Sequence, residues 1–327
     1  MTRITLSRAI NEGLRRSLES DHKVMIMGED VGRLGGVFRV TDGLQKDFGE
    51  HRVVDTPLAE AGIVGTAIGL ALRGYRPVCE IQFDGFVYPA TDQIVTQLAK
   101  MRYRSQGHVR LPVVIRIPFG GGIGAVEHHS ESPEVFFAHT AGLRVVACAD
   151  PADAFSMIQQ AIASDDPVIF FEPKRRYWDK AEVDTAAPLD AAFPLDKART
   201  VHEGTDVTLL SYGPQVRTCL EAALAAEQDG RSVEVIDLRS LSPLDMETVA
   251  ASVSRTGRCV VVHEAPVYAG LGAEIAARVT EACFYHLEAP VLRVGGFAIP
   301  YPSARAEDHY LPDLDKIMDA VDRTFGY

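Results

Sequence analysis

The pattern of apolar and polar residues in this 327-residue chain alternates between short apolar runs and longer stretches with helical spacing. The first such stretch, residues 5–19, carries one apolar stripe, which predicts a helix with Ser7 as its N-cap. Further helices are predicted over residues 57–73, 89–104, 152–163, 215–227, 244–253, 272–283 and 314–325. Strands are predicted over residues 24–27, 76–83, 111–117, 144–149, 168–172, 207–212, 232–238, 259–262 and 291–294.

This alternation of strands and helices predicts an α/β protein of two doubly wound domains, each with a mostly parallel sheet covered on both faces. Residues 179–205 break the pattern, since they are rich in Ala, Asp and Pro and have no sustained period. We therefore expect a first domain over residues 1–180, a surface linker over 181–204 and a second, smaller domain over 205–327.

Composition narrows the classes of function. The net charge is −12 at pH 7 and no basic stripe occurs, so a nucleic acid is not an expected partner. The only tight basic cluster, Lys174–Arg176, is typical of a solvated loop or a subunit contact. The five cysteines lack the spacing of a zinc site, and no apolar run reaches the roughly 18 residues of a membrane helix. Because the N-terminus has no features of a signal peptide, we expect a cytoplasmic protein.

The stretch Asp55–Gly62 carries the most information. Thr56 fits an N-cap and Pro57 the first helical position. Glu60 then falls in the first turn, one residue too late for a capping box, and the small apolar residues 61–71 allow close packing. A first-turn glutamate is often a surface group that the helix dipole stabilises. In such an apolar setting, the alternative is a carboxylate that binds a proton on a buried partner.

A second candidate site follows the strand predicted at residues 111–117. The cluster Gly120–Gly124 formally matches a dinucleotide-binding fingerprint, which would suit a nicotinamide oxidoreductase. However, His128 and His129 follow in place of a helix start, and no acid lies at the usual spacing. The other interpretation is a flexible loop that brings the two histidines to a ligand, because imidazole titrates near neutral pH. The sequence has no nucleophile elbow, P-loop or HExxH motif.

Several short motifs occur in the same order as in one known family. They are Gly28–Val31, Asp55–Gly62, Glu80–Phe83, Asp92–Ile94, His129–Glu134, Asp237–Pro243, His263–Pro266 and Gly295–Pro300. Together they resemble the beta subunit of the thiamine-diphosphate-dependent 2-oxo acid dehydrogenase component, which serves the pyruvate, branched-chain and acetoin dehydrogenase complexes. The resemblance covers nearly the whole chain and implies a pyrimidine-binding first domain and a transketolase-type C-terminal domain.

The resemblance gives Glu60 a partner. In this family the matching glutamate hydrogen-bonds a ring nitrogen of the aminopyrimidine of thiamine diphosphate and helps to activate the thiazolium carbon. Leu58, Gln82 and Phe86 match positions that line the pyrimidine ring. Some members carry tyrosine in place of Phe86, so a hydroxyl contact is absent from this chain.

The resemblance also implies roles on the substrate side. His129 matches a histidine that reaches the substrate or the lipoyl group, and His128 lies beside it. Glu29 matches an acid proposed to link paired active sites. Family members hold a monovalent cation, usually potassium, through backbone carbonyls, and the matching positions are Val113, Ala161, Ile162, Ser164 and Asp166. An ordinary helix end over residues 161–166 explains the same positions equally well.

The family further implies a second polypeptide. Thiamine enzymes hold magnesium and the diphosphate through a Gly-Asp-Gly motif that ends in Asn-Asn, whereas this chain has no Gly-Asp-Gly and a single asparagine, Asn11. We therefore expect an alpha subunit to hold the magnesium, in an alpha-two-beta-two heterotetramer with the active site at the subunit interface. The C-terminal domain is expected to dimerise and to bind the subunit-binding domain of the dihydrolipoyl acyltransferase, and a lipoyl domain is the expected acyl acceptor.

The predicted function is oxidative decarboxylation of a 2-oxo acid with acyl transfer to lipoamide, with this chain as the beta subunit. Glu80–Phe83 and Leu287–Pro290 look more like the branched-chain members. Branched-chain 2-oxo acids are therefore the expected substrates, with pyruvate or acetoin as the alternative. The alternative of another class is a non-catalytic assembly subunit that bridges the alpha subunit to the acyltransferase core.

Overall fold

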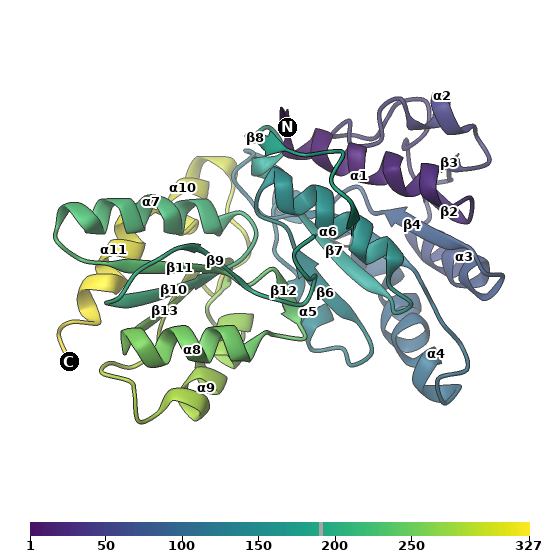
Figure 1. The fold of residues 1–327 in the computed structure, drawn as a ribbon. Coiled ribbons are helices and arrows are strands. Elements are labelled where there is room, and N and C mark those ends of the chain that lie inside the picture. Colours follow the sequence, from purple (N-terminus) through teal and green to yellow (C-terminus); the bar gives the residue numbers. More distant parts are fainter. Residues whose placement is uncertain (190–191) are drawn as a thin grey trace.

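The structure is a computed structural model that describes residues 1–189 and 192–327 (Figure 1). Its strands are β1 (Thr2–Thr5), β2 (Val24–Gly28), β3 (Val53–Asp55), β4 (Arg76–Glu80), β5 (Val114–Phe119), β6 (Arg144–Ala147), β7 (Val168–Pro173), β8 (Lys180–Val183), β9 (Arg199–His202), β10 (Val207–Ser211), β11 (Val233–Asp237), β12 (Ser240–Ser242), β13 (Cys259–Pro266) and β14 (Leu292–Gly296). Its α-helices are α1 (Leu6–Ser20), α2 (Leu44–Phe48), α3 (Glu60–Leu72), α4 (Ala99–Arg104), α5 (Glu134–Ala138), α6 (Pro151–Ala163), α7 (Gln215–Gln228), α8 (Met246–Thr256), α9 (Leu271–Cys283), α10 (Glu307–Tyr310) and α11 (Leu314–Arg323).

The first sheet has the strand order β12-β6-β7-β5-β4-β2-β3, and its strands run parallel except for β12. Successive residues of its central strands face opposite sides. Val114 and Val168 belong to the buried cluster under α1 and α6, whereas Ile115 and Ile169 belong to the cluster under α3 and α4 (Figure 1). Because both faces are buried, these strands are mostly apolar, which is why the sequence predicts them well. The exceptions in β5 and β7 are the buried charges of Arg116 and Glu172, which pair with each other (2.6 Å).

The second sheet has the strand order β14-β13-β10-β11-β9 and is parallel except for β9. Leu209 and Val235 pack with helices α7 and α11, while Leu210 and Ile236 pack on the side of α8 and α9. The cluster that contains Leu210 continues into the α3 side of the first sheet, so the two halves share one core. The predicted fold class, an α/β protein with two doubly wound sheets, is confirmed.

The segment 181–204, which we expected to be a linker, contains regular structure. Strand β8 pairs antiparallel with β1, and β9 pairs antiparallel with β11 at an edge of the second sheet. The sequence also does not predict β1, β3 or β12, which are only three or four residues long. Short strands of mostly polar or half-exposed residues give little periodic signal. Residues 190 and 191 of the expected linker lie outside the described residues.

The head of α3 differs from the prediction. The amide of Thr56 donates to the Gly28 carbonyl (2.9 Å), which holds this stretch beside β2 in a non-helical conformation. The helix begins at Glu60, with Ala59 as its N-cap, so the predicted start at Thr56 and Pro57 is wrong. Glu60 is still in the first helical turn, as its first residue.

Two other helices differ in detail. Thr5 caps α1 in place of Ser7, because the Thr5 hydroxyl accepts a hydrogen bond from an amide of the first turn. The helix predicted over residues 89–104 is not uniform. A 3₁₀ helix, η1 (Asp84–Ala90), precedes a π-helical segment, η2 (Gln93–Leu98), before α4 begins.

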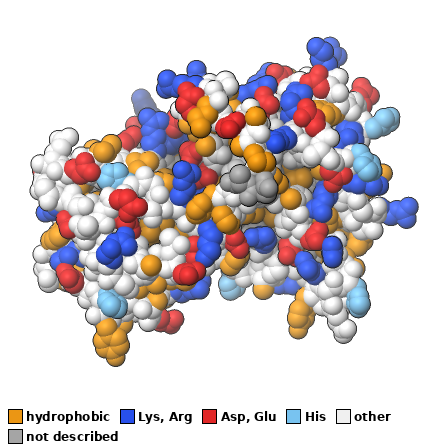
Figure 2. All heavy atoms as spheres, viewed as in Figure 1, with side chains coloured by type: hydrophobic (Ala, Val, Ile, Leu, Met, Phe, Trp, Pro, Cys, Tyr) orange, Lys and Arg blue, Asp and Glu red, His pale blue; other side chains and the backbone are white. Residues whose placement is uncertain are grey.

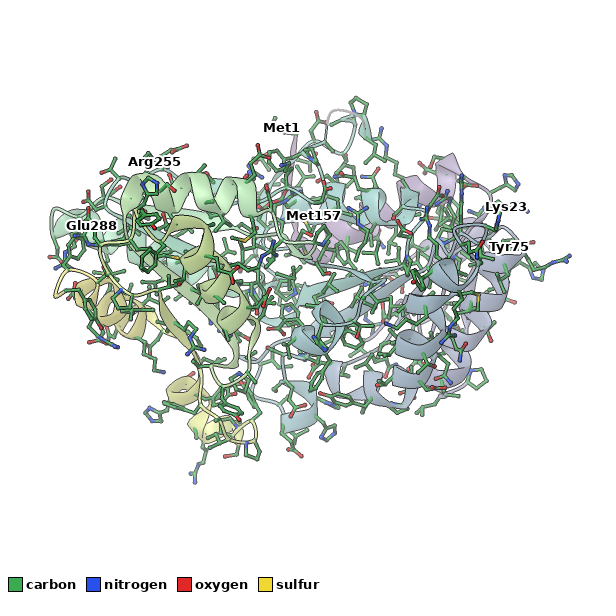
Figure 3. The ribbon with its side chains drawn as sticks, turned by 90° about the horizontal axis from the view of Figure 1, so that it is seen from below. Met1, Lys23, Tyr75, Met157, Arg255 and Glu288 are labelled. Atoms are coloured by element: carbon green, nitrogen blue, oxygen red, sulfur yellow. The ribbon has the colours of Figure 1, made fainter. Side chains whose placement is uncertain are left out.

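The surface carries both charge signs. On the face shown in Figure 2, blue and red side chains are interspersed and no large field of one sign appears. Seen from below, Lys23 and Tyr75 lie together at one end of the molecule (Figure 3), with Lys23 Nζ 4.5 Å from the centre of the Tyr75 ring. No helix within the described residues has the length and apolar character needed to cross a membrane.

Candidate active site

The carboxyl ends of β2, β3 and β4 bring predicted site residues to one edge of the first sheet. The register pairs Gly28, at the end of β2, with Asp55 at the end of β3 and with Glu80 at the end of β4. Glu29 directly follows β2, and Glu60 begins α3 after β3. Ligands of open α/β sheets bind at this edge. The strand register therefore places the two glutamates in the same region without any special loop.

Glu29 and Glu60 are both buried, each with 8% of its surface exposed. Burial raises the pKa of Glu29, and the neighbouring carboxylates of Glu60 and Asp30 raise it further. Glu29 thus takes up a proton more readily than an ordinary glutamate, and Glu60 is one of the causes. The two acids therefore lie close enough for the charge of Glu60 to act on the carboxyl of Glu29.

The other residues matched to the pyrimidine site differ in burial and contacts; they are Gln82, Phe86 and Leu58. The side-chain amide of Gln82 donates to the Glu29 carbonyl (3.3 Å) and helps to fix the turn after β2. The ring of Phe86, in η1, is half-buried and lies 5.1 Å from the His129 ring, centre to centre. Leu58 is 79% exposed, so this apolar side chain is free to pack on a ligand or a partner.

The two histidines lie on aromatic side chains from the segment after β4. The His129 ring stacks on Phe83 with ring centres 4.0 Å apart and an interplanar angle of 11°, and it meets Phe86 edge-on. His128 is half exposed, with its ring centre 4.4 Å from that of His129. Within residues 1–189 and 192–327, His129 Nδ1 is buried without a hydrogen-bond partner. This nitrogen faces the protein interior, whereas the ring as a whole is only partly buried.

The glycine cluster does not act as the dinucleotide fingerprint requires. The amides of Gly122 and Gly124 donate to the two carboxylate oxygens of Glu307 (2.8 and 3.0 Å), a residue of the second half of the chain. A 3₁₀ turn, η3 (Glu127–His129), follows the glycines, where the fingerprint needs the start of a helix. The dinucleotide interpretation is therefore wrong, because a carboxylate of the protein takes the amides that would bind phosphate.

Asp84 and Lys174 lie beside the histidines, although the sequence analysis does not assign them to a site. They form an ion pair whose two side chains are fully buried. Burial raises the pKa of Asp84 to about 6 and lowers the pKa of Lys174, while the attraction within the pair opposes both shifts. The prediction of a solvated basic cluster is therefore wrong for Lys174. The signal that could have found both residues is their position, since each follows a strand at the same sheet edge.

The positions matched to a potassium site lie at the end of α6 and beside β5. The carbonyls of Ile162 and Ser164 both accept hydrogen bonds from Nη1 of Arg76 (3.0 Å each). The carbonyls of Val113, Ala161 and Asp166 also accept hydrogen bonds within the protein. At least one lone pair of each oxygen is thus in use. The potassium site stays a prediction.

The residues present fit the pyrimidine half of thiamine diphosphate. Three groups are suited to bind a planar, basic heterocycle: the buried carboxylate of Glu60, the half-buried ring of Phe86 and the buried hydroxyl of Thr56, which has no hydrogen-bond partner among the described residues. In the part of the chain that the structure describes, no three His, Cys, Asp or Glu side chains converge to hold a metal ion.

Comparison with known proteins points to one class. A family model described as the transketolase pyrimidine-binding domain matches residues 2–179, and one described as the transketolase C-terminal domain matches residues 196–317. The solved structure "Split gene transketolase, inactive beta4 tetramer" matches with a TM-score of 0.79 and 23% identity, over 99% of this chain and 98% of that chain. At this identity the likeness concerns the fold alone. The chain has a transketolase-like two-domain fold.

Two curated relatives identify the family within this class of fold. The "Pyruvate dehydrogenase E1 component subunit beta" of Leifsonia xyli subsp. xyli is 61% identical over 99% of this chain and 95% of that protein. The "3-methyl-2-oxobutanoate dehydrogenase subunit beta" of Mycobacterium tuberculosis is 54% identical over 98% of this chain and 91% of that protein. The chain belongs to the family of beta subunits of thiamine-diphosphate-dependent 2-oxo acid dehydrogenase components, as its motifs predict. The two names differ in the 2-oxo acid, so similarity identifies the family and not the substrate.

Proposed function

We propose that this chain is the catalytic beta subunit of a component that decarboxylates branched-chain 2-oxo acids and transfers the acyl group to lipoamide. The observation that carries the proposal is the setting of Glu60. Its carboxylate is buried at the head of α3, at the carboxyl edge of a parallel sheet and next to a second acid, Glu29. A buried acid in this place is suited to hold a proton on a bound heterocycle.

Each site residue then has a specific task. When bound, thiamine diphosphate supplies the carbanion chemistry of decarboxylation. Glu60 hydrogen-bonds a ring nitrogen of the pyrimidine and keeps a proton at that atom, while Leu58 and Phe86 pack on the ring and exclude water. His129, whose imidazole is partly exposed, exchanges a proton with the substrate or the acyl acceptor. Glu29, whose pKa is raised by burial and by the charge of Glu60, is the acid that links this site to a paired one.

The magnesium and diphosphate are proposed to lie on an alpha subunit, in an alpha-two-beta-two heterotetramer. This proposal is supported by the missing Gly-Asp-Gly motif and by the relatives named as beta subunits. The purified chain alone should neither bind thiamine diphosphate tightly in calorimetry nor turn over 2-oxo acids. Adding the alpha subunit should restore both. Turnover by the isolated chain would contradict the shared site.

Glu60→Gln separates catalysis from the alternative of a non-catalytic assembly subunit. We expect a strong loss of turnover with an intact heterotetramer, which size-exclusion chromatography and sedimentation would verify. Unchanged turnover in an intact heterotetramer would instead support the assembly role.

The substrate class is the finer part of the proposal. The motifs Glu80–Phe83 and Leu287–Pro290 favour branched-chain 2-oxo acids, whereas the 61% identical relative with pyruvate in its name favours pyruvate as a second candidate. Turnover of the reconstituted alpha-beta pair with 3-methyl-2-oxobutanoate and with pyruvate decides between them. A higher kcat/KM for pyruvate would overturn the first choice.

The second half of the chain is proposed to bind the subunit-binding domain of a dihydrolipoyl acyltransferase, while a lipoyl domain brings the acyl acceptor to the histidines. The net charge of −12 supports an electrostatic contribution from a basic partner. Binding should weaken as ionic strength rises and on charge reversal of exposed acids in residues 200–327. Affinity that responds to neither change would contradict this mode of docking.

The potassium proposal has a simple test. If the carbonyls around Ile162 and Ser164 hold potassium, thermal unfolding should occur at a higher temperature in potassium chloride than in choline chloride of equal ionic strength. Equal unfolding temperatures would leave these residues as an ordinary helix end held by Arg76.

A further inference from the structure

The loop that carries His128 and His129 has little regular structure of its own. Residues 120–133 contain a 3₁₀ turn of three residues, and the two ends of the loop meet through the hydrogen bond from the Gly120 amide to the Glu131 carbonyl (2.9 Å). A single 3₁₀ turn is not stable in isolation. Contacts from outside the loop must therefore decide where the two imidazoles lie.

A buried ion pair supplies two of these contacts. Lys174 directly follows β7, and Asp84 follows β4, and their side chains pair with no surface exposed to solvent. Lys174 Nζ also donates to the carbonyl of His129 (2.6 Å), and Asp84 Oδ2 accepts from the amide of Glu131 (2.7 Å). The pair thus holds the backbone on both sides of Ser130.

The residues next to Asp84 shape the place of the imidazole. A Cβ atom at Gly85 would lie 2.3 Å from the His128 carbonyl oxygen, so only glycine lets the loop backbone come this close. On the other side, Phe83 provides the ring on which His129 stacks. Lys174 Nζ lies 5.5 Å from the centre of the same ring. Residues 83–85 and Lys174 therefore act on one short piece of the loop.

Stability alone does not account for this pair. The cost of removing two ions from water roughly cancels their attraction, and apolar side chains of similar volume often serve stability equally well. Apolar side chains cannot, however, bind a carbonyl and an amide of the same loop. The feature that the pair adds is a fixed backbone position, held by charge-assisted hydrogen bonds.

We propose that Lys174 and Asp84 are positioning residues, whose ion pair fixes the backbone around Ser130 and thereby orients the ring of His129 on Phe83. This inference rests on the proposed function of His129 at the substrate and lipoyl side. When the pair is removed, the loop detaches and His129 leaves its stacked position, while Glu60 stays at the head of α3.

The first test reads the loop directly and does not depend on activity. In the complex with its alpha subunit, the double variant Lys174→Met/Asp84→Asn removes both charges and leaves no buried ion unpaired. Hydrogen exchange followed by mass spectrometry should show faster exchange for amides in residues 126–131 and unchanged exchange in α3. A matched control is Lys197→Met, which breaks a lysine pair with Asp245 (3.3 Å) far along the chain. Loop exchange at the wild-type rate in the double variant would overturn the proposal.

The second test asks whether the pair acts through His129. The double variant should lower kcat by roughly 100-fold, with a smaller change in KM, because a displaced group loses its catalytic alignment. In a His129→Ala background the same two substitutions should cause no further loss. A further loss as large as in the wild type would overturn the proposal. If His129→Ala alone keeps full turnover, the proposed function of His129 fails, and the exchange measurement still decides the positioning role.

Discussion

The head of α3 and the loop 120–133 contribute to one proposed site, but they are held in place in different ways. Glu60 is placed by the parallel register of β2, β3 and β4 and by the start of a regular helix. The histidine loop has one helical turn of three residues. It depends on side chains from distant positions, which are Asp84, Lys174, Glu264 and Glu307.

The two kinds of support differ in how well they should tolerate amino-acid substitution. Backbone hydrogen bonds of the sheet and helix support Glu60, and no single side chain is essential to them. The loop is supported by a few buried charges, and the removal of one partner leaves the other unpaired at a considerable cost. We therefore expect the outer face of α3 to tolerate substitution and the loop contacts to tolerate very little.

The largest expected effect is the loss of kcat in Glu60→Gln, and a comparison with His129→Ala separates the roles of α3 and the loop. Glu60→Gln should lower kcat by roughly 10²- to 10⁴-fold, because an amide carries no charge and cannot hold a proton on the cofactor. His129→Ala should cost less in decarboxylation than in acyl transfer, measured with an artificial electron acceptor and with a lipoyl domain. Glu247→Gln, at a first-turn glutamate of α8, is the matched control and should behave as wild type. If Glu60→Gln and His129→Ala lowered kcat equally in the decarboxylation and the acyl-transfer assay, the two residues could not be assigned to different steps.

The second prediction concerns the support of the loop from the other half of the chain. Glu307→Ala leaves the amides of Gly122 and Gly124 and the hydroxyl of Tyr301 without their acceptor. The free energy of unfolding should fall by about 3 kcal/mol, seen as a lower midpoint in denaturant. Glu307→Gln keeps one acceptor oxygen and should cost less. A loss no larger for alanine than for glutamine would show that the loop does not depend on this carboxylate.

Two glycine-to-alanine substitutions test how closely the backbone is packed beside the loop and on α3. Gly85→Ala should destabilise the protein by about 1–3 kcal/mol, since its Cβ would collide with the main chain of His128. Gly65→Ala, on the exposed face of α3 with no atom within 4 Å of its Cβ, should stabilise the isolated chain by about 0.5–1 kcal/mol. Urea denaturation of the isolated chain measures both. If both substitutions changed the free energy of unfolding in the same direction, the proposed difference between the loop and α3 would be wrong.

The smallest expected effect is a pH dependence just after the loop. The buried carboxyl of Glu134 accepts a hydrogen bond from the hydroxyl of Tyr212, and burial raises its pKa from 4.5 to about 7. Because the folded pKa exceeds the unfolded one, the stabilising contribution of the protonated group is complete below 4.5 and is lost as the pH rises through about 7. Glu134→Gln, which cannot ionise, should flatten this slope, so that its stability relative to wild type rises between about pH 5 and pH 8. Thermal unfolding with parallel slopes for both proteins would contradict the assignment.

Much of the fold could be predicted because its central strands are buried on both faces. The strand β7, predicted over residues 168–172 and observed over Val168–Pro173, is an example. Strand β12 could not be predicted, since it has three residues and its partner β6 lies almost a hundred positions earlier in the chain. The start of α3 was misplaced because Thr56 uses its amide in a bond to Gly28, which a local cap pattern cannot reveal.

The site residues likewise could be predicted only where a local sequence pattern places them. The placement of Glu29 and Glu60 at the sheet edge follows from strand ends and a helix start, which periodicity locates. The end of β7 places Lys174 at the same edge, but its burial could not be predicted, because a lysine in a basic cluster is normally solvated. Its burial depends on Asp84, 90 positions away, and no local pattern reports that partner.

The bond from Gly124 to Glu307 spans 183 positions along the chain and ties the segment before the imidazoles to the far half of the molecule. Any displacement of one half against the other, whether thermal or driven by an arriving protein, would therefore act on the backbone just before the imidazoles through this one buried carboxylate.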